Sequence, residues 1–367
     1  MAFEATKREW GELYAFFRLL ADGYVFAGTP DAKKNEALRY PVVMVQREEH
    51  DGTRQYIIEE EEIHICGEKI DKRIPREDFD AVAQLVLEAL RNSRDNEVTS
   101  PDGVEEFLDE VAIYDLEAKT DDRTDFHVAF YSMDTPLVGL CVRSKLSPMF
   151  PLLDGGRSAN FKFEQTGVKF ATPTVNKINA FGEEEDVVGR MLMIERLGGI
   201  LKFNDAADKI FRSNLGMIDL HFPRVLGEMV RAMHLEGMTK VTDLTEHIKQ
   251  LNPLKIKDEL IVKHRYYEYK MKQFLMALAL GMRPAKMFNG TDSAIAGFLL
   301  VDGQGEMICY QKSDRDTFAD FLYNNTRLEK GSTNKDKYGY LERENGVYYF
   351  KLNLKIGLMK RWERTYL

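Results

Sequence analysis

Polar side chains suited to phosphate chemistry gather on one predicted β-hairpin. The sequence pattern predicts two strands, at residues 124–133 and 137–146, joined by a tight turn. Because side chains alternate between the two faces of a strand, Asp125 shares a face with Arg143 and Lys145. In one register Asp125 lies opposite Lys145, and a slip of two residues places it opposite Arg143. In either register a carboxylate and two cations meet at the open end of the hairpin.

Nucleases of the PD-(D/E)XK kind use such an arrangement. In these enzymes an Asp begins one strand, and the next strand carries an acidic or small residue followed two positions later by Lys. The carboxylate holds Mg²⁺, which takes one or two carboxylates together with waters and phosphate oxygens. The lysine orients or deprotonates the attacking water, and the metal stabilises the charge on the phosphate. The competing interpretation is an ion pair across two surface strands, which is common in sheets.

The elements that must position this hairpin are a mixture of helices and strands. A helix is predicted at residues 6–21, where apolar residues recur at helical spacing on one face: Trp10, Leu13, Tyr14, Phe17 and Leu20. Strand-like segments at 41–47 and 55–62 precede a second helix at 79–90. Later elements are helices at 184–197, 206–215, 225–234 and 258–280 and hairpins at 297–311 and 338–356. This order predicts an α/β (α+β) protein with a mixed sheet flanked by helices.

The charge of the chain is unevenly distributed. The 367 residues include 51 Lys+Arg and 60 Asp+Glu, which gives a formal net charge of −9. Residues 1–135 carry −16 and residues 136–367 carry +7. Because a phosphate backbone responds to the local field, the C-terminal part could offer a basic face to DNA. Basic residues that only balance a solvated surface would give the same count.

The composition excludes several classes of protein. No apolar run reaches about 18 residues, so a transmembrane helix is excluded, and the N-terminus lacks the pattern of a secretory signal. Cys66, Cys141 and Cys309 are too scattered for a disulfide framework or a zinc cluster. A cytoplasmic protein is therefore expected. The sequence contains no phosphate-binding glycine loop and no serine-hydrolase signature.

Segments along nearly the whole chain resemble the HpaII family of type II restriction endonucleases. They begin with Glu-Trp-Gly-Glu-Leu-Tyr-Ala-Phe at residues 9–16 and end with Glu-Asn-Gly-Val-Tyr-Tyr-Phe-Lys-Leu-Asn-Leu at 344–354. The resemblance keeps its order through the intervening segments at 19–23, 118–120, 139–146, 152–153, 158–164, 214–219, 279–282 and 332–333. This continuity makes the resemblance more specific than the hairpin alone.

The resemblance implies Mg²⁺-dependent hydrolysis of double-stranded DNA at a short site, which is CCGG for the enzyme that gives the family its name. It implies a PD-(D/E)XK-like nuclease core, expected at residues 111–250. An acidic N-terminal region at 1–110, which includes the first core helix, and a basic α+β region at 251–367 would elaborate this core, unless the chain forms one continuous domain. A DNA methyltransferase would protect host DNA, and palindromic sites favour a homodimer. No membrane partner is expected.

The second strand of the hairpin departs from the family pattern. Where relatives are expected to have a small or acidic residue and then Lys, this strand has Cys141 and Arg143. A thiol is a poor ligand for Mg²⁺, which prefers hard oxygen donors. An arginine cannot act as a base near neutral pH, although it can orient water and bind phosphate. Lys145, two residues further on the same face, could supply the missing amine.

The metal site needs a second carboxylate, and the first helix offers two. The resemblance places the metal at Asp125, and either Glu12 or Glu9 could complete the site. Solvation of the helix surface, or compensation of the helix dipole near its N-terminus, would explain either glutamate equally well.

A basic polar loop precedes the last hairpin and is a candidate for reading DNA. Arginine commonly binds guanine, whereas lysine, serine and threonine contact phosphates or bases. A flexible surface loop is the alternative interpretation. The candidate DNA-binding residues are Arg327, Lys330, Ser332, Thr333, Asn334, Lys335 and Lys337.

Three functions are compatible with these patterns. The first is a sequence-specific DNA endonuclease that uses Mg²⁺. The second is a catalytically weakened DNA-recognition or modification-sensing protein, which the Cys141 and Arg143 substitutions favour. The third is a base-excising enzyme that acts without metal. An assay of plasmid cleavage with Mg²⁺ and with EDTA separates the three.

Overall fold

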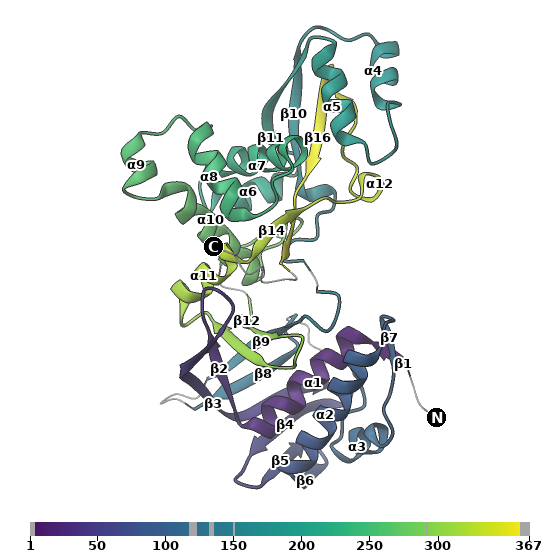
Figure 1. Cartoon of the computed structure of the whole chain (residues 1–367), viewed down its shortest axis with the longest axis vertical. Coiled ribbons are helices and arrows are strands. Elements are labelled where there is room, and N and C mark those ends of the chain that lie inside the picture. Colours follow the sequence, from purple (N-terminus) through teal and green to yellow (C-terminus); the bar gives the residue numbers. More distant parts are fainter. Residues whose placement is uncertain (1–3, 117–122, 132–135, 150, 291–292, 360–367) are drawn as a thin grey trace. The chain divides into compact units, whose positions relative to one another are not determined.

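The chain forms two compact units, and each is interrupted in sequence (Figure 1). The computed structural model describes residues 4–116, 123–131, 136–149, 151–290 and 293–359. Unit 1 comprises the described residues before 150 and residues 293–321, and unit 2 comprises 151–290 and 322–359. The boundaries predicted near residues 110 and 250 do not coincide with this division, because two late strands complete the sheet of unit 1. No helix among the described residues is long and apolar enough to cross a membrane.

Unit 1 is built on a nine-stranded mixed sheet. The strand order is β2-β13-β12-β9-β8-β3-β4-β5-β6, and an additional pairing of β2 with β3 closes six of these strands into a barrel. The β12–β9 and β13–β2 pairs are parallel, whereas the other pairs are antiparallel. The strands are β2 (Tyr24–Gly28), β3 (Lys34–Glu49), β4 (Gly52–Ile58), β5 (Glu62–Gly67), β6 (Ile70–Pro75), β8 (Phe126–Phe130), β9 (Leu137–Ser144), β12 (Ile295–Val301) and β13 (Met307–Gln311).

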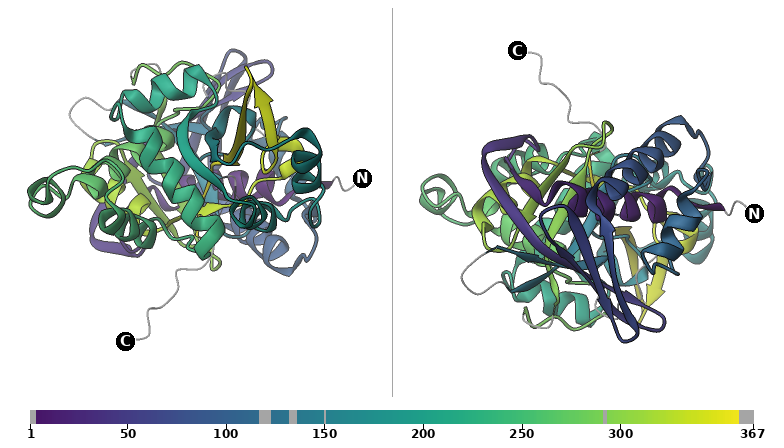
Figure 2. Two further views of the ribbon diagram at one scale, coloured as in Figure 1. Left: turned by 90° about the horizontal axis from the view of Figure 1, so that it is seen from above. Right: turned by 90° about the horizontal axis from the view of Figure 1, so that it is seen from below.

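Helix α1 (Lys7–Asp22) confirms the first predicted helix and supports the sheet. Thr6 and Glu9 form a capping box at its N-terminus, and Gly23 ends it in the left-handed conformation, with φ of 69°. The helix packs against β9 and β3, and a Cβ added at Gly11 would lie 3.5 Å from the Cβ of Ser144. Helix α2 (Arg76–Asn92) lies beside α1 (Figure 2). Short elements complete unit 1: β1 (Glu4–Thr6), β7 (Glu97–Thr99) and α3 (Val104–Glu110).

An aromatic cluster joins the helices of unit 1 to its sheet. The ring of Phe16 meets Tyr56 and Phe126 edge-on, at centroid distances of 4.8 and 6.0 Å. Phe17 makes similar contacts with Phe79 and Phe107. Such pairs add roughly 0.5–1.5 kcal/mol each beyond the burial of area. The packing therefore fixes α1 against the strand that follows Asp125.

Unit 2 has a four-stranded antiparallel sheet covered by helices. The strand order is β11-β10-β16-β15, and β14 pairs separately with β17. The strands are β10 (Asn160–Gly167), β11 (Gly199–Ala206), β14 (Thr326–Glu329), β15 (Leu341–Glu344), β16 (Val347–Asn353) and β17 (Lys355–Leu358). The helices are η1 (Arg157–Ala159), α4 (Thr172–Asn179), α5 (Val187–Arg196), α6 (Lys209–Gly216), α7 (Phe222–Glu236), α8 (Val241–Leu251), α9 (Asp258–Val262), α10 (Tyr266–Ala279) and α12 (Thr333–Asp336). The division between the units falls within α11 (Arg315–Asn324).

The mixed α/β class is confirmed, with one element predicted wrongly. The hairpins expected at 297–311 and 338–356 correspond to β12–β13 and β15–β16. The single helix expected at 258–280 is instead two helices, α9 and α10. The chain breaks at Arg265, which has a left-handed backbone with φ of 48° and cannot continue an α-helix.

Candidate active site

The β8–β9 hairpin forms, but in neither of the predicted registers. Phe126 pairs with Leu140 and His127 with Gly139, and the Asp125 N–H binds the Leu140 carbonyl, so Asp125 lies next to Leu140 and not opposite Arg143 or Lys145. Among the described residues the pairs run as far as Ala129 with Leu137, and part of the turn predicted at 134–136 lies outside the described residues. Even-numbered slips keep every side chain on its face, so the alternation in sequence could not select among registers.

Asp125 is held at the start of β8 by the backbone of both strands. Its N–H donates to the Leu140 carbonyl at 2.9 Å, and its Oδ2 accepts the N–H of Val142 at 2.6 Å. The side chain is 12% exposed. Hydrogen bonds of this kind orient a carboxylate and leave its second oxygen, Oδ1, directed at another group.

That other group is Arg8, which also binds the second candidate carboxylate. Arg8 Nη2 lies 3.9 Å from Asp125 Oδ1, and Arg8 Nε donates to Glu12 Oε1 at 2.7 Å. The Glu12 side chain is 7% exposed, although it lies in the first turns of a helix. One guanidinium therefore spans a carboxylate of α1 and a carboxylate at the start of β8. Sequence reasoning missed Arg8, and the available signal was its spacing of four residues from Glu12.

Glu9 has a different function from Glu12. Its Oε2 accepts the backbone N–H of Thr6 at 2.8 Å and the Thr6 hydroxyl at 2.6 Å. This engagement in the capping box matches the interpretation of Glu9 as an N-terminal helix residue. Of the two glutamates, Glu12 is the one that shares a cation with Asp125.

The donor set suits a hard divalent cation. Asp125 and Glu12 supply carboxylate oxygens within reach of one guanidinium, and Mg²⁺ needs only one or two carboxylates beside water and phosphate oxygens. The described part of the chain contains no group of three His, Cys, Asp or Glu side chains suited to a metal. Cys141 is buried, and its thiol donates to the Arg123 carbonyl at 3.4 Å. These residues thus fit Mg²⁺ through two oxygen ligands and not through sulfur.

The two basic residues Arg143, in β9, and Lys145, directly after it, have different surroundings. The guanidinium of Arg143 lies 4.9 Å from the centre of the Phe298 ring, and its Nε is buried without a hydrogen-bond partner among the described residues. The Lys145 N–H donates to the Val301 carbonyl, which continues the pairing with β12. Burial lowers the pKa of the Lys145 amine, and the charge of Asp302 opposes this shift. The expectation that Lys145 lies opposite Asp125 is wrong, because the β8–β9 register pairs Phe126 with Leu140.

The predicted DNA-reading loop contains the short helix α12, and its residues divide by exposure. Lys330, Asn334, Lys335 and Lys337 are exposed. Thr333 is fully buried, and its N–H and hydroxyl both donate to Glu185 Oε1 at 3.2 Å, so its side chain faces the interior of unit 2 and not a DNA molecule. The Ser332 hydroxyl accepts the N–H of Lys335 and caps the helix. Arg327 pairs with Glu329 at 3.0 Å.

Buried polar side chains fix this loop. Arg190 is 1% exposed and donates its Nε to the Gly339 carbonyl at 2.7 Å. Its terminal nitrogens donate to the carbonyls of Phe181, Glu183 and Glu184. The loop that presents the exposed lysines is therefore preorganised, and Arg190 is a second residue that sequence reasoning missed.

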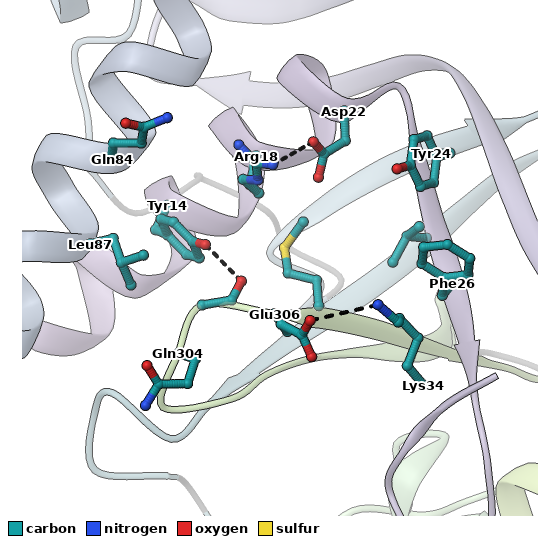
Figure 3. Close-up of a pocket in the computed structure, with 13 residues that line it drawn as sticks. Tyr14, Arg18, Asp22, Tyr24, Phe26, Lys34, Gln84, Leu87, Gln304 and Glu306 are labelled. Carbon is teal, nitrogen blue, oxygen red and sulfur yellow. Dashed lines mark hydrogen bonds and ion pairs between the residues drawn. The ribbon is translucent and has the colours of Figure 1, made fainter. Parts of the chain in front are cut away.

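A pocket of about 410 Å³ in unit 1 contains none of the candidate catalytic residues (Figure 3). The Tyr14 hydroxyl donates to the Gly305 carbonyl at 2.6 Å, and burial raises the pKa of Tyr14 to about 12. Charged groups of the lining are paired, since Arg18 meets Asp22 and Lys34 Nζ lies 3.6 Å from a carboxylate oxygen of Glu306. The pocket therefore carries no role in the proposed hydrolysis.

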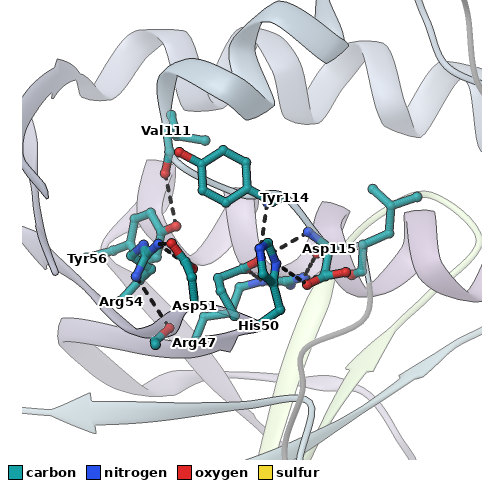
Figure 4. Close-up of polar contacts among 11 residues, drawn as sticks. Arg47, His50, Asp51, Arg54, Tyr56, Val111, Tyr114 and Asp115 are labelled. Carbon is teal, nitrogen blue, oxygen red and sulfur yellow. Dashed lines mark hydrogen bonds and ion pairs between the residues drawn. The ribbon is translucent and has the colours of Figure 1, made fainter. Parts of the chain in front are cut away.

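A buried ion pair at the end of β3 anchors residues 114–116, and Figure 4 shows Arg47 close to Asp115. Arg47 Nε donates to Glu49 Oε1 at 2.7 Å, and both side chains are almost fully buried. Glu49 Oε2 accepts the backbone N–H groups of Tyr114 and Asp115, and Arg47 donates to the carbonyls of Asp115 and Leu116. The end of β3 thus fixes residues 114–116.

The comparisons with known proteins agree along the full length of the chain. The family model described as HpaII restriction endonuclease matches residues 6–358. The chain is 30% identical over 360 residues to the type II restriction enzyme HpaII of Haemophilus parainfluenzae, an alignment that covers 96% of this chain and 98% of that enzyme. No solved structure matches. Asp125 and Glu12, which share the Arg8 cation beside the β8–β9 hairpin, thus lie in a homologue of a type II restriction enzyme. The family model and the alignment both span nearly the whole chain, so the chain belongs to the HpaII restriction endonuclease family.

Proposed function

We propose that this protein cleaves double-stranded DNA at a short site with the aid of Mg²⁺, through a core of the PD-(D/E)XK kind formed by α1, β8 and β9. The observation that carries the proposal is the convergence of Asp125 and Glu12 on one cationic group in a restriction endonuclease homologue. The CCGG of the family's namesake is the first site to test. A methyltransferase that protects this site and a homodimer matched to its palindrome belong to the same proposal.

Asp125 and Glu12 would hold the metal. The hydrogen bond from the Val142 N–H to Asp125 Oδ2 fixes the carboxylate, so Oδ1 remains directed towards the metal position. Bound Mg²⁺ would supply Lewis-acid stabilisation of the charge that develops on the phosphate oxygens. The protein's contribution is to place the two carboxylates before the DNA arrives.

We assign orientation of the phosphate or of the attacking water to Arg143. It lies two residues beyond Cys141 on the strand face that Asp125 shares, roughly 7 Å along the strand at about 3.3 Å per residue. Lys145 lies two residues further, roughly 13 Å from the position opposite Asp125 by the same estimate. Stacking on Phe298 restrains the Arg143 guanidinium. Lys145 remains the second candidate, because its buried amine loses a proton more easily than an exposed lysine.

Unit 2 would bind the DNA backbone and its bases. Lys330, Asn334, Lys335 and Lys337 project from a loop that Arg190 fixes. A fixed loop loses less conformational entropy on binding, which favours specific recognition. Exposed lysines suit phosphate contacts, and Asn334 offers the amide that pairs with adenine edges or phosphates.

The test is cleavage of a supercoiled plasmid that carries CCGG sites. We expect discrete fragments with Mg²⁺, no cleavage in EDTA, and fragment ends that map to one short sequence. A matched plasmid methylated at CCGG is the control for recognition. Cleavage that persists in EDTA would contradict the metal-dependent mechanism, and ends at random positions would contradict site-specific recognition.

A second candidate function rests on Cys141 and Arg143, which replace the residues expected in the catalytic strand. A protein with this strand could bind its site tightly and cut it slowly. The same plasmid experiment decides, because this alternative predicts a gel shift on CCGG duplexes without fragments after prolonged incubation with Mg²⁺. Arg143→Lys, which restores the expected lysine, would then increase the cleavage rate.

A further inference from the structure

Arg8 occupies the position between two carboxylates that a metal would also occupy. Its Nε lies 2.7 Å from Glu12 Oε1, and its Nη2 lies 3.9 Å from Asp125 Oδ1. The two carboxylate side chains are 7% and 12% exposed, so their mutual repulsion is poorly screened by solvent. A cation between them offsets this repulsion and keeps both groups charged.

A second arginine on the same helix, Arg18, forms ordinary surface ion pairs. Arg18 pairs with Asp22 at the same spacing of four residues, at 2.7 Å, and also contacts Asp80 of α2. Those carboxylates are 27% and 41% exposed. Pairs of this kind contribute roughly 0–1 kcal/mol. Arg8 differs because both of its carboxylates are shielded and one of them begins the candidate catalytic strand.

The first turns of α1 have anchors other than Arg8. The Arg8 side chain is 38% exposed, and it belongs to the first turns of α1. The capping box of Thr6 and Glu9, together with the hydrogen bond from Trp10 Nε1 to the Val98 carbonyl, holds this end of the helix independently of Arg8. The guanidinium stays charged at any ordinary pH, so it leaves by rotation of its side chain and not by loss of a proton.

We propose that Arg8 is an internal cation that substitutes for the metal between Glu12 and Asp125 and that a divalent metal must displace it to bind. Arg8 is thus a positioning residue: it keeps the two carboxylates together in the metal-free protein and sets the affinity of the site for metal. This inference rests on the proposed function, since it takes Asp125 and Glu12 as the ligands of the metal.

The test measures Mn²⁺ affinity of the full chain without DNA, by the EPR signal of free Mn²⁺. Because Arg8 is a competing unit charge about 4 Å from the Asp125 carboxylate, Arg8→Ala should bind Mn²⁺ roughly tenfold or more tightly. Arg8→Lys, which keeps the charge, should stay close to wild type. Arg18→Ala is the matched control on the same helix and should leave Mn²⁺ affinity unchanged. Unchanged or weaker binding by Arg8→Ala overturns the proposal.

Two further variants separate the role of Arg8 from the metal site itself and from a failure to fold. Arg8→Gln removes the charge but keeps a polar side chain, so it serves if Arg8→Ala does not fold, and its thermal unfolding should shift more on addition of Mn²⁺ than that of wild type. An equal or smaller shift overturns the proposal. Asp125→Asn should lose Mn²⁺ binding. If Asp125→Asn binds Mn²⁺ as wild type does, the metal site of the proposed function fails, whereas loss in Asp125→Asn with no change in Arg8→Ala removes only the role of Arg8.

Discussion

The two units of this protein carry opposite charge. In the sequence, residues 1–150 and 293–321, which contain unit 1, have 20 Lys+Arg against 37 Asp+Glu, a formal charge of −17. Residues 151–292 and 322–361, which contain unit 2, have 30 against 22, a formal charge of +8. The carboxylates proposed to hold metal are in unit 1, and the exposed lysines of the α12 loop are in unit 2. Metal ligation needs negative charge and DNA binding needs positive charge, so the comparison assigns hydrolysis to unit 1 and most of the affinity for DNA to unit 2.

Both units use a buried arginine to fix a neighbouring segment of the chain. In unit 1, Arg47 with Glu49 fixes residues 114–116, and in unit 2, Arg190 fixes the loop around α12. Arg47 has a carboxylate partner, whereas the hydrogen bonds of Arg190 go to backbone carbonyls and its guanidinium lies 4.4 Å from the centre of the Tyr340 ring. The difference shows that a buried guanidinium can be satisfied by many carbonyl acceptors when they converge.

The largest effect is expected from Asp125→Asn, which removes charge from the proposed metal site. Loss of a ligand that contributes several kcal/mol should lower the single-turnover cleavage rate by roughly 10³ or more. DNA affinity should change little, because the phosphate contacts are assigned to unit 2. Asp80→Asn, a carboxylate paired with Arg18 on the surface of unit 1, is the control. Cleavage at the wild-type rate by Asp125→Asn would break the assignment of catalysis to this residue.

Arg143→Ala and Lys145→Ala test which of the two residues orients the phosphate or the attacking water in unit 1. The observed register favours Arg143, so its loss should reduce single-turnover cleavage by about 10² at saturating DNA. Lys145→Ala should have a smaller effect, since the charged neighbour that acts on its amine is Asp302. A greater loss in Lys145→Ala than in Arg143→Ala would show that the lysine approaches the reacting groups in the complex with DNA.

Arg190→Ala tests the anchoring of the unit 2 loop. It leaves several backbone carbonyls without a buried donor, so the free energy of unfolding of unit 2 in urea should fall by about 2 kcal/mol or more. Arg196→Ala, at the exposed end of the same helix, is the matched control. If Arg190→Ala is as stable as this control, the loop is held by other contacts.

The smallest effects are expected from single lysines of the α12 loop. Lys335→Ala and Lys337→Ala should each weaken DNA binding several-fold, equally on target and non-target duplexes, if each contacts a phosphate. Each loss should reduce the slope of log K against log salt by about 0.9. Lys69→Ala, an exposed lysine of unit 1, should leave both the affinity and the slope unchanged. An equal effect of Lys69→Ala would show that unit 1 shares the DNA-binding face.

The sequence alone determined the features that depend on near neighbours. The capped helix α1, the β12–β13 and β15–β16 hairpins, the mixed α/β class and the charge asymmetry follow from apolar spacing, turn residues and composition. The family was also readable, because its segments recur in order along the chain.

Only the tertiary structure decided how distant residues meet. The register that pairs Phe126 with Leu140 was not readable, since a slip of two residues preserves every face of a strand. Thr333 is an ordinary polar loop residue in the sequence, and its burial depends on Glu185, 148 residues away. The bridge from Arg8 to Asp125 likewise exists because α1 packs beside β9, so chain folding, and not spacing along the chain, brings the cation to the carboxylate.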